Sequence, residues 1–369
     1  MKKRHVFFLF CLIACIFTTV TAVYSADIAV PLLELITRGY FENSTLVLGT
    51  RGTFDLLIGG GYKFGGRLVL NLESDHLEDI SLNKNLEFKS ISIITQEVFR
   101  LPLNITYFTG ELEDFCNGDV FTTLYGAESV GTRYRGYMYF PEGARYNGIY
   151  NLAGTGISIS TSSSLSEVFN ASLYAYQDSY LGKGYYSTDI RAILNLEKFK
   201  LESFAGYSFP ISTYGYFRAG LLLFYDTGGG GEFLTQIGVP KWDPAADPFN
   251  IDLFYFLFEP RVSFYPLSII LTLFWHPKYY KQQLTDDLGS VDINVNFQIG
   301  NPQKSPASGG LESSLKFSAH QTEQFRALVS PYFSAITSGL LWNLKLNVKV
   351  FPFVLADMFE AFIGVRAEF

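Results

Sequence analysis

The sequence predicts an all-β fold, a transmembrane antiparallel β-barrel of about 16 strands, with about 14–18 strands compatible with its length. Three observations support this prediction. The 369-residue chain is 48% hydrophobic and 17% aromatic, but its charged residues, at 17%, fall below the value of about 25% that is usual for soluble domains. Many segments of strand length alternate apolar and polar residues. Sustained helical periodicity is hard to find, and its best case, around residues 111–127, is poor.

Residues 1–26 are predicted to be a cleaved signal peptide. The basic MKKRH precedes the apolar run VFFLFCLIACIFTTV, which is too short to span a membrane comfortably. Small residues place the cleavage between Ala22 and Ala26. An alternative stays open, because the segment LIAC matches a lipoprotein cleavage box that would leave Cys15 acylated, although the apolar IFTTV after it argues against a tether. Residues 27–369 are then expected to form a single barrel domain.

The segment 291–300, VDINVNFQIG, shows the alternation without interruption. Its apolar residues, with Val295 at the centre, would lie on one face of a strand, and its polar residues, including Asn296, on the other. The polar face is expected to meet water. Further segments of strand length follow the chain: TFDLLIGGGYKF, GRLVLNLES, SISIITQEV, PLNITYFTG, YRGYMYF, GTGISIST, FNASLYAYQ, DIRAILNLE, KLESFAGYSF, YGYFRAGLLLFYD, FLTQIGV, IDLFYFLF, SIILTLFW, LESSLKFSA, FRALVSPYFSAI and LWNLKLNVKV.

Polar or proline-bearing segments separate these strands and predict loops at 74–85, 112–132, 240–249, 276–290 and 300–309. The regular spacing of strand and turn signals is typical of an all-β chain. No change in composition marks a second domain.

Two features of the pattern favour lipid over a protein core on the apolar face. The polar face consists largely of Asn, Ser, Gln, Tyr and Gly, which suits a wet, crowded lumen, and a soluble exported β-sandwich is the alternative. Aromatic residues gather near predicted strand ends, as in the girdles of membrane barrels. These residues are Tyr134 to Phe140, Tyr185, Tyr186, Tyr214 to Phe217, Trp242, Trp275, Tyr279 and Tyr280.

The chain ends in AFIGVRAEF, and counting back in twos from Phe369 gives an apolar face. In this ending the sequence resembles bacterial outer-membrane β-barrel proteins of the porin-like class. Gly364 and Phe369 match the family's C-terminal assembly signal, whereas Phe362 stands where a polar residue is usual. The resemblance implies contact with outer-membrane lipid and with the barrel-assembly machinery through the last strand.

This resemblance and the chain length lead us to expect a channel for passive passage or uptake of small solutes. A barrel of about 16–18 strands leaves an aqueous channel, whereas a small one is filled by side chains. Two alternatives stay open. A structural barrel or adhesin would bind partners through its loops, and a transporter of hydrophobic substrates could use the apolar segment 28–36, IAVPLLELI, as a plug or simply as its first strand.

The segment TRYRGYMYFPEGARY contains the most suggestive charges. Arg133 and Arg135 would share one strand face, and Arg145 lies across a turn. Charged side chains at mid-depth should face the lumen, because lipid exposure is costly there. Beside the acidic Glu111 and Glu113, these arginines are candidates for a constriction with a transverse field. Anchoring at the barrel rim is the competing interpretation.

Other chemistry is not expected. Removal of the three basic residues in the leader takes the formal charge from −7 to −10, which argues against a nucleic-acid partner. Histidine, cysteine and acidic residues show no metal-ligand spacing, so we predict no cofactor, no metal and no enzymatic activity. Cys116 would be the only cysteine of the mature chain, a lone thiol in an acidic loop. The oligomeric state cannot be derived from the sequence.

Overall fold

The computed structural model describes residues 26–42, 45–60, 63–74, 76–77, 85–134, 148–162, 164–210, 215–301, 305–318, 324–355 and 358–367. Eighteen strands form one sheet, at the upper end of the expected range. They are β1 (Ala26–Glu42), β2 (Thr45–Gly60), β3 (Phe64–Ser74), β4 (Asn85–Thr95), β5 (Leu103–Phe115), β6 (Tyr150–Thr161), β7 (Phe169–Asp178), β8 (Tyr185–Asn195), β9 (Phe199–Pro210), β10 (Tyr216–Asp226), β11 (Gly231–Trp242), β12 (Tyr255–Phe264), β13 (Leu267–Trp275), β16 (Val291–Ile299), β17 (Ala307–Phe317), β18 (Phe325–Thr337), β19 (Leu340–Phe351) and β20 (Phe359–Ala367).

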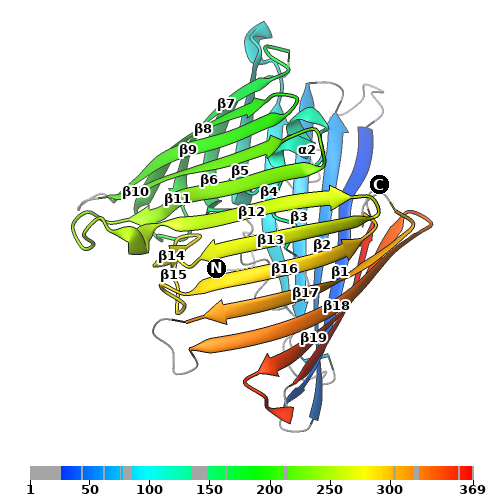
Figure 1. The fold of residues 1–369 in the computed structure, drawn as a ribbon. Coiled ribbons are helices and arrows are strands. Elements are labelled where there is room, and N and C mark those ends of the chain that lie inside the picture. The colour runs from blue at the N-terminus through cyan, green and yellow to red at the C-terminus, as the bar shows by residue number, and fades with distance from the viewer. Residues whose placement is uncertain are drawn as a thin grey trace.

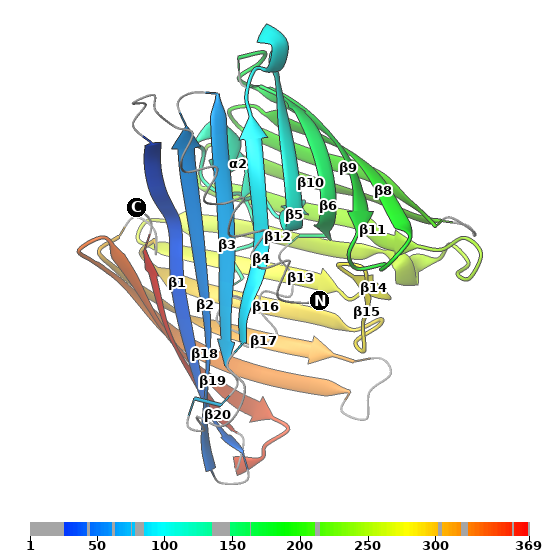
Figure 2. The ribbon, with the colours of Figure 1, turned by 180° about the vertical axis from the view of Figure 1, so that it is seen from behind.

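The sheet closes on itself into a barrel. Each strand pairs antiparallel with its sequence neighbours, and β1 pairs with β20 to complete the ring. Gly364 of β20 lies between Ile36 of β1 and Asn343 of β19. Closure pairs the ladder groups that would otherwise form open edges. Figures 1 and 2 show the ring from its two sides, with β1 to β4 on one wall and β10 to β13 on the other.

Several sequence predictions concern residues outside the described ranges. They include residues 1–25 of the predicted signal peptide 1–26, Arg135, Arg145, Phe369 and residues 135–140 of the predicted strand YRGYMYF. The apolar segment 28–36 belongs to β1. The transporter hypothesis therefore loses the plug that the sequence suggested. Within the described residues, no helix is long and apolar enough to cross a membrane.

The two faces of the ring differ as the alternation predicted. Apolar side chains on the outer face are exposed, for example Ile269, Phe297 and Leu344. Val295 shares this outer face, next to Leu271 of β13 in the register. The expectation that the polar face meets open water is wrong at Asn296, whose side chain is 1% exposed and accepts a hydrogen bond of 2.8 Å from the Tyr332 hydroxyl.

The two ends of the barrel are also different. One end has short turns, and the first strand begins and the last strand ends there. The other end has longer connections, among them 116–149, 243–254 and 276–290. Outer-membrane barrels place short turns on the periplasmic side and long loops outside, so we name the two ends accordingly.

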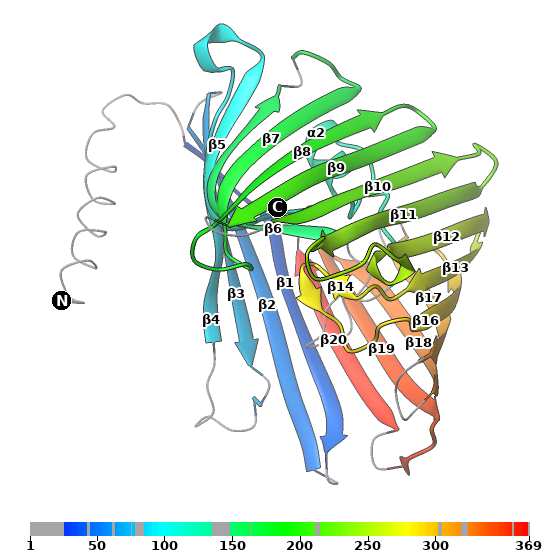
Figure 3. The same ribbon diagram turned by 90° about the vertical axis from the view of Figure 1, so that its left-hand side faces the viewer.

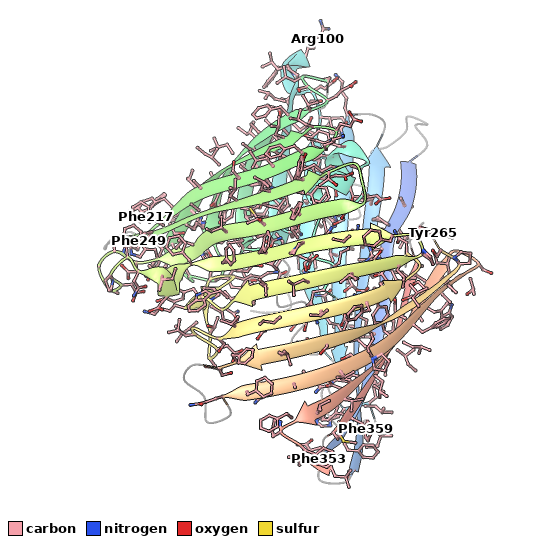
Figure 4. The ribbon with its side chains drawn as sticks, viewed as in Figure 1. Arg100, Phe217, Phe249, Tyr265, Phe353 and Phe359 are labelled. Carbon is pink, nitrogen blue, oxygen red and sulfur yellow. The ribbon has the colours of Figure 1, made fainter. Side chains whose placement is uncertain are left out.

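Aromatic rings line the outer face near the extracellular end. Ring contacts run from Tyr207 to Phe217 at 4.8 Å, to Trp242 at 5.7 Å and on to Phe249 at 5.1 Å between centroids. Figure 4 shows Phe217 and Phe249 close together at this edge. The sequence placed Phe217 and Trp242 in such a girdle, and the structure confirms that they lie at strand ends. The same prediction is wrong for Tyr134 and Tyr280, which pack against buried apolar residues inside the ring.

Candidate lumen constriction

The connection after β5 turns into the barrel instead of extending away from it. We call residues 116–134 the inner segment. It contains the short helix α2 (Val120–Tyr125), which lies between β1–β4 and β10–β12 in Figures 1 and 2. The segment closes on itself, because the Val130 N–H donates to the Gly118 carbonyl at 3.4 Å. A Cβ on Gly118 would lie 2.3 Å from the backbone nitrogen of Gly131, so this turn requires glycine.

Apolar packing holds the inner segment against the inside of the barrel wall. Phe121 of α2 is fully buried, and Phe115 at the end of β5 contacts the rings of Phe204 and Tyr174, with centroids 5.1 and 5.3 Å apart. The wall residues of this cluster come from β5 to β13. A hydrophobic core inside the ring was not predicted from the sequence, which suggested a wet lumen throughout. Burial of this apolar surface gives the segment a fixed position.

A buried glutamate on β9 fixes the start of the inner segment. The Cys116 N–H donates to Glu202 Oε1 at 2.6 Å, and the Arg191 Nε donates to the same oxygen at 2.9 Å. Arg191 also forms an ion pair with Glu113 of β5. Charge-assisted hydrogen bonds of this kind are shorter and stronger than neutral ones. Cys116 itself is fully buried beside this group.

A second buried glutamate, on β12, fixes the end of the inner segment. Glu259 accepts hydrogen bonds from Thr132 Oγ1 at 2.5 Å, the Arg133 N–H at 2.7 Å, Thr272 Oγ1 at 2.6 Å and Arg261 Nε at 2.9 Å. Arg261 also donates to the carbonyl of Gly131 at 2.6 Å. The side chains of Arg261 and Glu259 are 3% and 0% exposed. The segment is thus fixed to the wall by backbone and side-chain bonds together.

The end of the inner segment reaches a third part of the ring. The Lys345 Nζ of β19 lies 5.9 Å from the centroid of the Tyr134 ring, within the range of a cation–π contact. Lys345 is buried and pairs with Glu312 of β17 at 2.5 Å. Contacts with β9, β12 and β19 mean that the segment crosses the interior.

Three of the residues that the sequence grouped as a constriction, Glu111, Glu113 and Arg133, lie in the described part of the chain. Glu111 and Glu113 lie on β5, because this strand continues to Phe115 where a loop was predicted. Among the described residues, Glu111 pairs with Lys89 at 3.1 Å and Glu113 with Arg191. Arg133 lies inside the barrel, but not on a strand, since the inner segment is irregular there.

The residues that anchor the inner segment were missed at the sequence level. Glu202 and Glu259 each interrupt a strand-length apolar run, KLESFAGYSF and YFLFEPRV. A charge in the middle of a membrane-spanning strand must face inward and needs a partner, which was the available signal. Their partners Arg191 and Arg261 sit in the same kind of position.

The inner face of β1 to β4 has a different character. Arg67 pairs with Asp55 at 2.6 Å, but its side chain is 41% exposed. Arg38 pairs with Glu360 of β20 at 2.5 Å, and both are partly exposed. Arg51 is half-buried on the same inner face. On this side of the interior the arginine side chains stay more exposed than Arg191 and Arg261, although Asp55 is buried.

Comparison with known proteins identifies the fold. The solved structure of OccK5 of Pseudomonas aeruginosa is similar to this one, with a TM-score of 0.55 and 10% sequence identity over 92% of this chain and 97% of that one. Wzi of Escherichia coli, described as a carbohydrate-binding β-barrel involved in group 1 capsule assembly, gives 0.53 at 10% identity over 96% and 87%. OccAB2 of Acinetobacter baumannii gives 0.52 at 11% identity over 93% and 98%.

Sequence comparison adds no closer relative. No family model matches the chain, and no curated protein matches it. At identities of 10–11%, the likeness to solved structures is one of fold. The chain therefore has the porin-like fold of bacterial outer-membrane β-barrels.

Proposed function

We propose that this protein is an outer-membrane channel through which small hydrophilic solutes pass passively. One observation carries the proposal: Glu259 holds the inner segment across the interior of a closed 18-strand ring. Barrels of about 16–18 strands are wide enough for an aqueous channel. A segment fixed inside such a ring narrows it and sets the size of the solute that passes.

The solute path runs along the inner face of β1 to β4. This face is the one whose charged side chains stay accessible, with Arg51, Arg67 and Arg38 exposed to different degrees. Across from it, the inner segment brings Arg133 into the interior. Charges of both signs along a narrow water path set the preference between cations and anions. The pairing of Arg133 with Arg135, Arg145, Glu111 and Glu113 in one constriction is part of this proposal.

Single-channel recording in planar bilayers tests the function. The wild-type protein should conduct, and Arg51→Glu should shift the reversal potential toward cations, because it reverses a charge beside the path. Arg100→Glu is the matched control, since Arg100 is exposed on a periplasmic turn that protrudes from the barrel (Figure 4). Absence of conductance from the folded protein would contradict the proposal. An equal shift of the reversal potential in Arg51→Glu and Arg100→Glu would mean that the solute path does not run along the inner face of β1 to β4.

A second candidate is a closed barrel that binds partners through its extracellular loops. It is favoured by the near-complete burial of Asn296, Glu312 and other inward residues of β16 to β19. If inward side chains fill the whole cross-section of the ring in this way, no path for solutes remains. The same recordings distinguish the two functions, because a closed barrel inserts without conducting.

The proposal includes the outer membrane as the location. The exposed apolar outer face suits contact with outer-membrane lipid, and a signal peptide at residues 1–26 would direct export. Assembly through the C-terminal strand fits the position of Gly364 at the closure of the ring. Mass measurement should give a mature N-terminus between Val23 and Asp27. An acylated Cys15 would contradict this part.

A further inference from the structure

A hairpin in the extracellular connection 276–290 crosses the mouth of the barrel. It consists of β14 (Tyr279–Tyr280) and β15 (Gln283–Leu284), and we call it the mouth hairpin. Its two turn residues, Lys281 and Gln282, have φ values of 44° and 69°. Such a turn suits a two-residue hairpin but favours Gly or Asn, so the backbone conformation is strained for these side chains. Figure 3 shows β14 beside β11 at this end.

The tip of the mouth hairpin contacts the far side of the ring. Lys281 Nζ donates to Asp114 Oδ1 of β5 at 3.0 Å, and Gln282 Nε2 donates to the Asn151 carbonyl of β6 at 3.2 Å. The hairpin starts after β13, which lies roughly opposite β5 in the 18-strand ring. A connection between these strands therefore spans the opening.

The stem of the mouth hairpin is attached to the wall from which it starts. The Tyr280 ring stacks on Tyr255 of β12 with centroids 6.0 Å apart. Lys278 forms an ion pair with Asp247, and the Tyr279 hydroxyl donates to the same carboxylate at 2.9 Å. None of these stem contacts involves Lys281 or Gln282, so release of the tip leaves the hairpin joined to its own wall.

We propose that the mouth hairpin is a charge-held gate, closed when Lys281 pairs with Asp114 and open when this pair separates. The inference rests on the proposed channel function. Both side chains of the pair are about one-quarter exposed or less, 24% and 20%, and so remain in contact with water. An ion pair of this kind is worth little and weakens with salt, so it can open and close readily.

The charges around Lys281 make the contact specific. It is faced by Asp114 of β5, by the Asp119 carboxylate of the inner segment at longer range, and by the Tyr280 ring at 5.9 Å. Lys281 therefore faces negative charge from both β5 and the inner segment. A negative charge at position 281 would be repelled from the closed position.

Charge reversal and restoration test the gate. Lys281→Glu and Asp114→Lys should each raise the open fraction in single-channel recordings, by up to about fivefold. The double variant Lys281→Glu with Asp114→Lys should return it toward the wild-type value. Lys183→Glu is the matched control, because Lys183 is exposed on another extracellular connection, 179–184, and its reversal should leave the open fraction unchanged. Failure of the double variant to recover would overturn the proposal.

A covalent version of the contact gives an independent result. Lys281→Cys with Asp114→Cys, in a Cys116→Ser background, is treated with a short reducible bis-thiol reagent. Bridging should lower the conductance, and reduction should restore it. A bridge that forms without changing the conductance overturns the gate but leaves the channel intact. Failure to bridge means that the tip does not reach β5, and absence of conductance in every variant overturns the channel and the gate together.

Discussion

The inner faces of two parts of the ring carry similar ion pairs in different surroundings. On β7 to β13, which we call the filled wall, Arg261 and Glu259 are almost completely buried. On β1 to β4, the open wall, Arg67 pairs with Asp55 but keeps a large part of its side chain in water. Glu202 and Glu259 hold the inner segment on the filled wall, and the end of the segment reaches Lys345 of β19. One wall therefore uses its charges to hold protein, and the other presents them to the lumen.

The difference follows from what covers each pair. A buried ion pair needs further hydrogen bonds to offset the loss of hydration, and Glu259 obtains them from the inner segment. A pair in contact with water needs no such support and contributes little to stability. Removal of the carboxylate from an ion pair should therefore lower the free energy of unfolding more on the filled wall than on the open wall.

The largest effect is expected on the filled wall. Glu259→Ala removes the fully buried carboxylate from Arg261, which keeps only the partly exposed Glu232, and removes the bonds to Thr132 and Arg133. Loss of one partner from a buried pair costs about 3–5 kcal/mol. Urea unfolding in lipid vesicles, followed by tryptophan fluorescence, measures this change. A loss below about 1 kcal/mol would mean that the wall is hydrated and would remove the distinction between the two walls.

Thiol labelling compares accessibility of the two inner faces directly. The two variants are Asn296→Cys and Thr53→Cys, each with Cys116 replaced by Ser. Asn296 lies on β16, next to the filled wall, and Thr53 lies on the open wall. Because Asn296 is buried and Thr53 is half-buried, only the thiol at position 53 should react quickly with a small water-soluble maleimide. Equal rates at the two positions would show that both faces meet the same water.

A smaller effect is expected on the open wall. Asp55→Ala removes the partner of Arg67, but water can solvate the arginine side chain, which is 41% exposed. The expected loss of unfolding free energy is therefore about 0–1 kcal/mol, measured as for Glu259→Ala. A loss as large as that of Glu259→Ala would contradict an accessible lumen at this wall.

The smallest effect is expected from mild acid on the stem of the mouth hairpin. Burial opposes ionisation of Asp247, but hydrogen bonds from Lys278 and Tyr279 outweigh it, so its pKa lies below the usual 3.8. A lowered folded-state pKa gives stability that is present above the unfolded value and is lost only as the pH falls through the folded value. Asp247 therefore stays ionised between pH 7 and pH 5, and it should cause no change in conductance over this range. A change in conductance between pH 7 and pH 5 that is present in the wild type and absent in Asp247→Asn would contradict this prediction.

The sequence was sufficient for most of the strands but not for the interior. Alternation in VDINVNFQIG depends on neighbouring residues, and the outward position of Val295 follows from it. The inner segment depends on contacts between residues that are 86 and 126 positions apart. No local pattern records such contacts, so the segment was identified as a loop without a position. A count of charges inside apolar strands would have identified Glu202 and Glu259, but not what they bind.

The separation between the inner segment and its anchors also sets an order of events. Glu202 and Glu259 lie on β9 and β12, so the segment has no anchor until these strands have formed. Long closures of this kind are slow steps in folding. The Cys116 thiol is open to reagents in an unfinished barrel and fully covered in the finished one. The time at which Cys116 becomes protected against a pulse of alkylating reagent therefore reports when the interior of the barrel becomes filled.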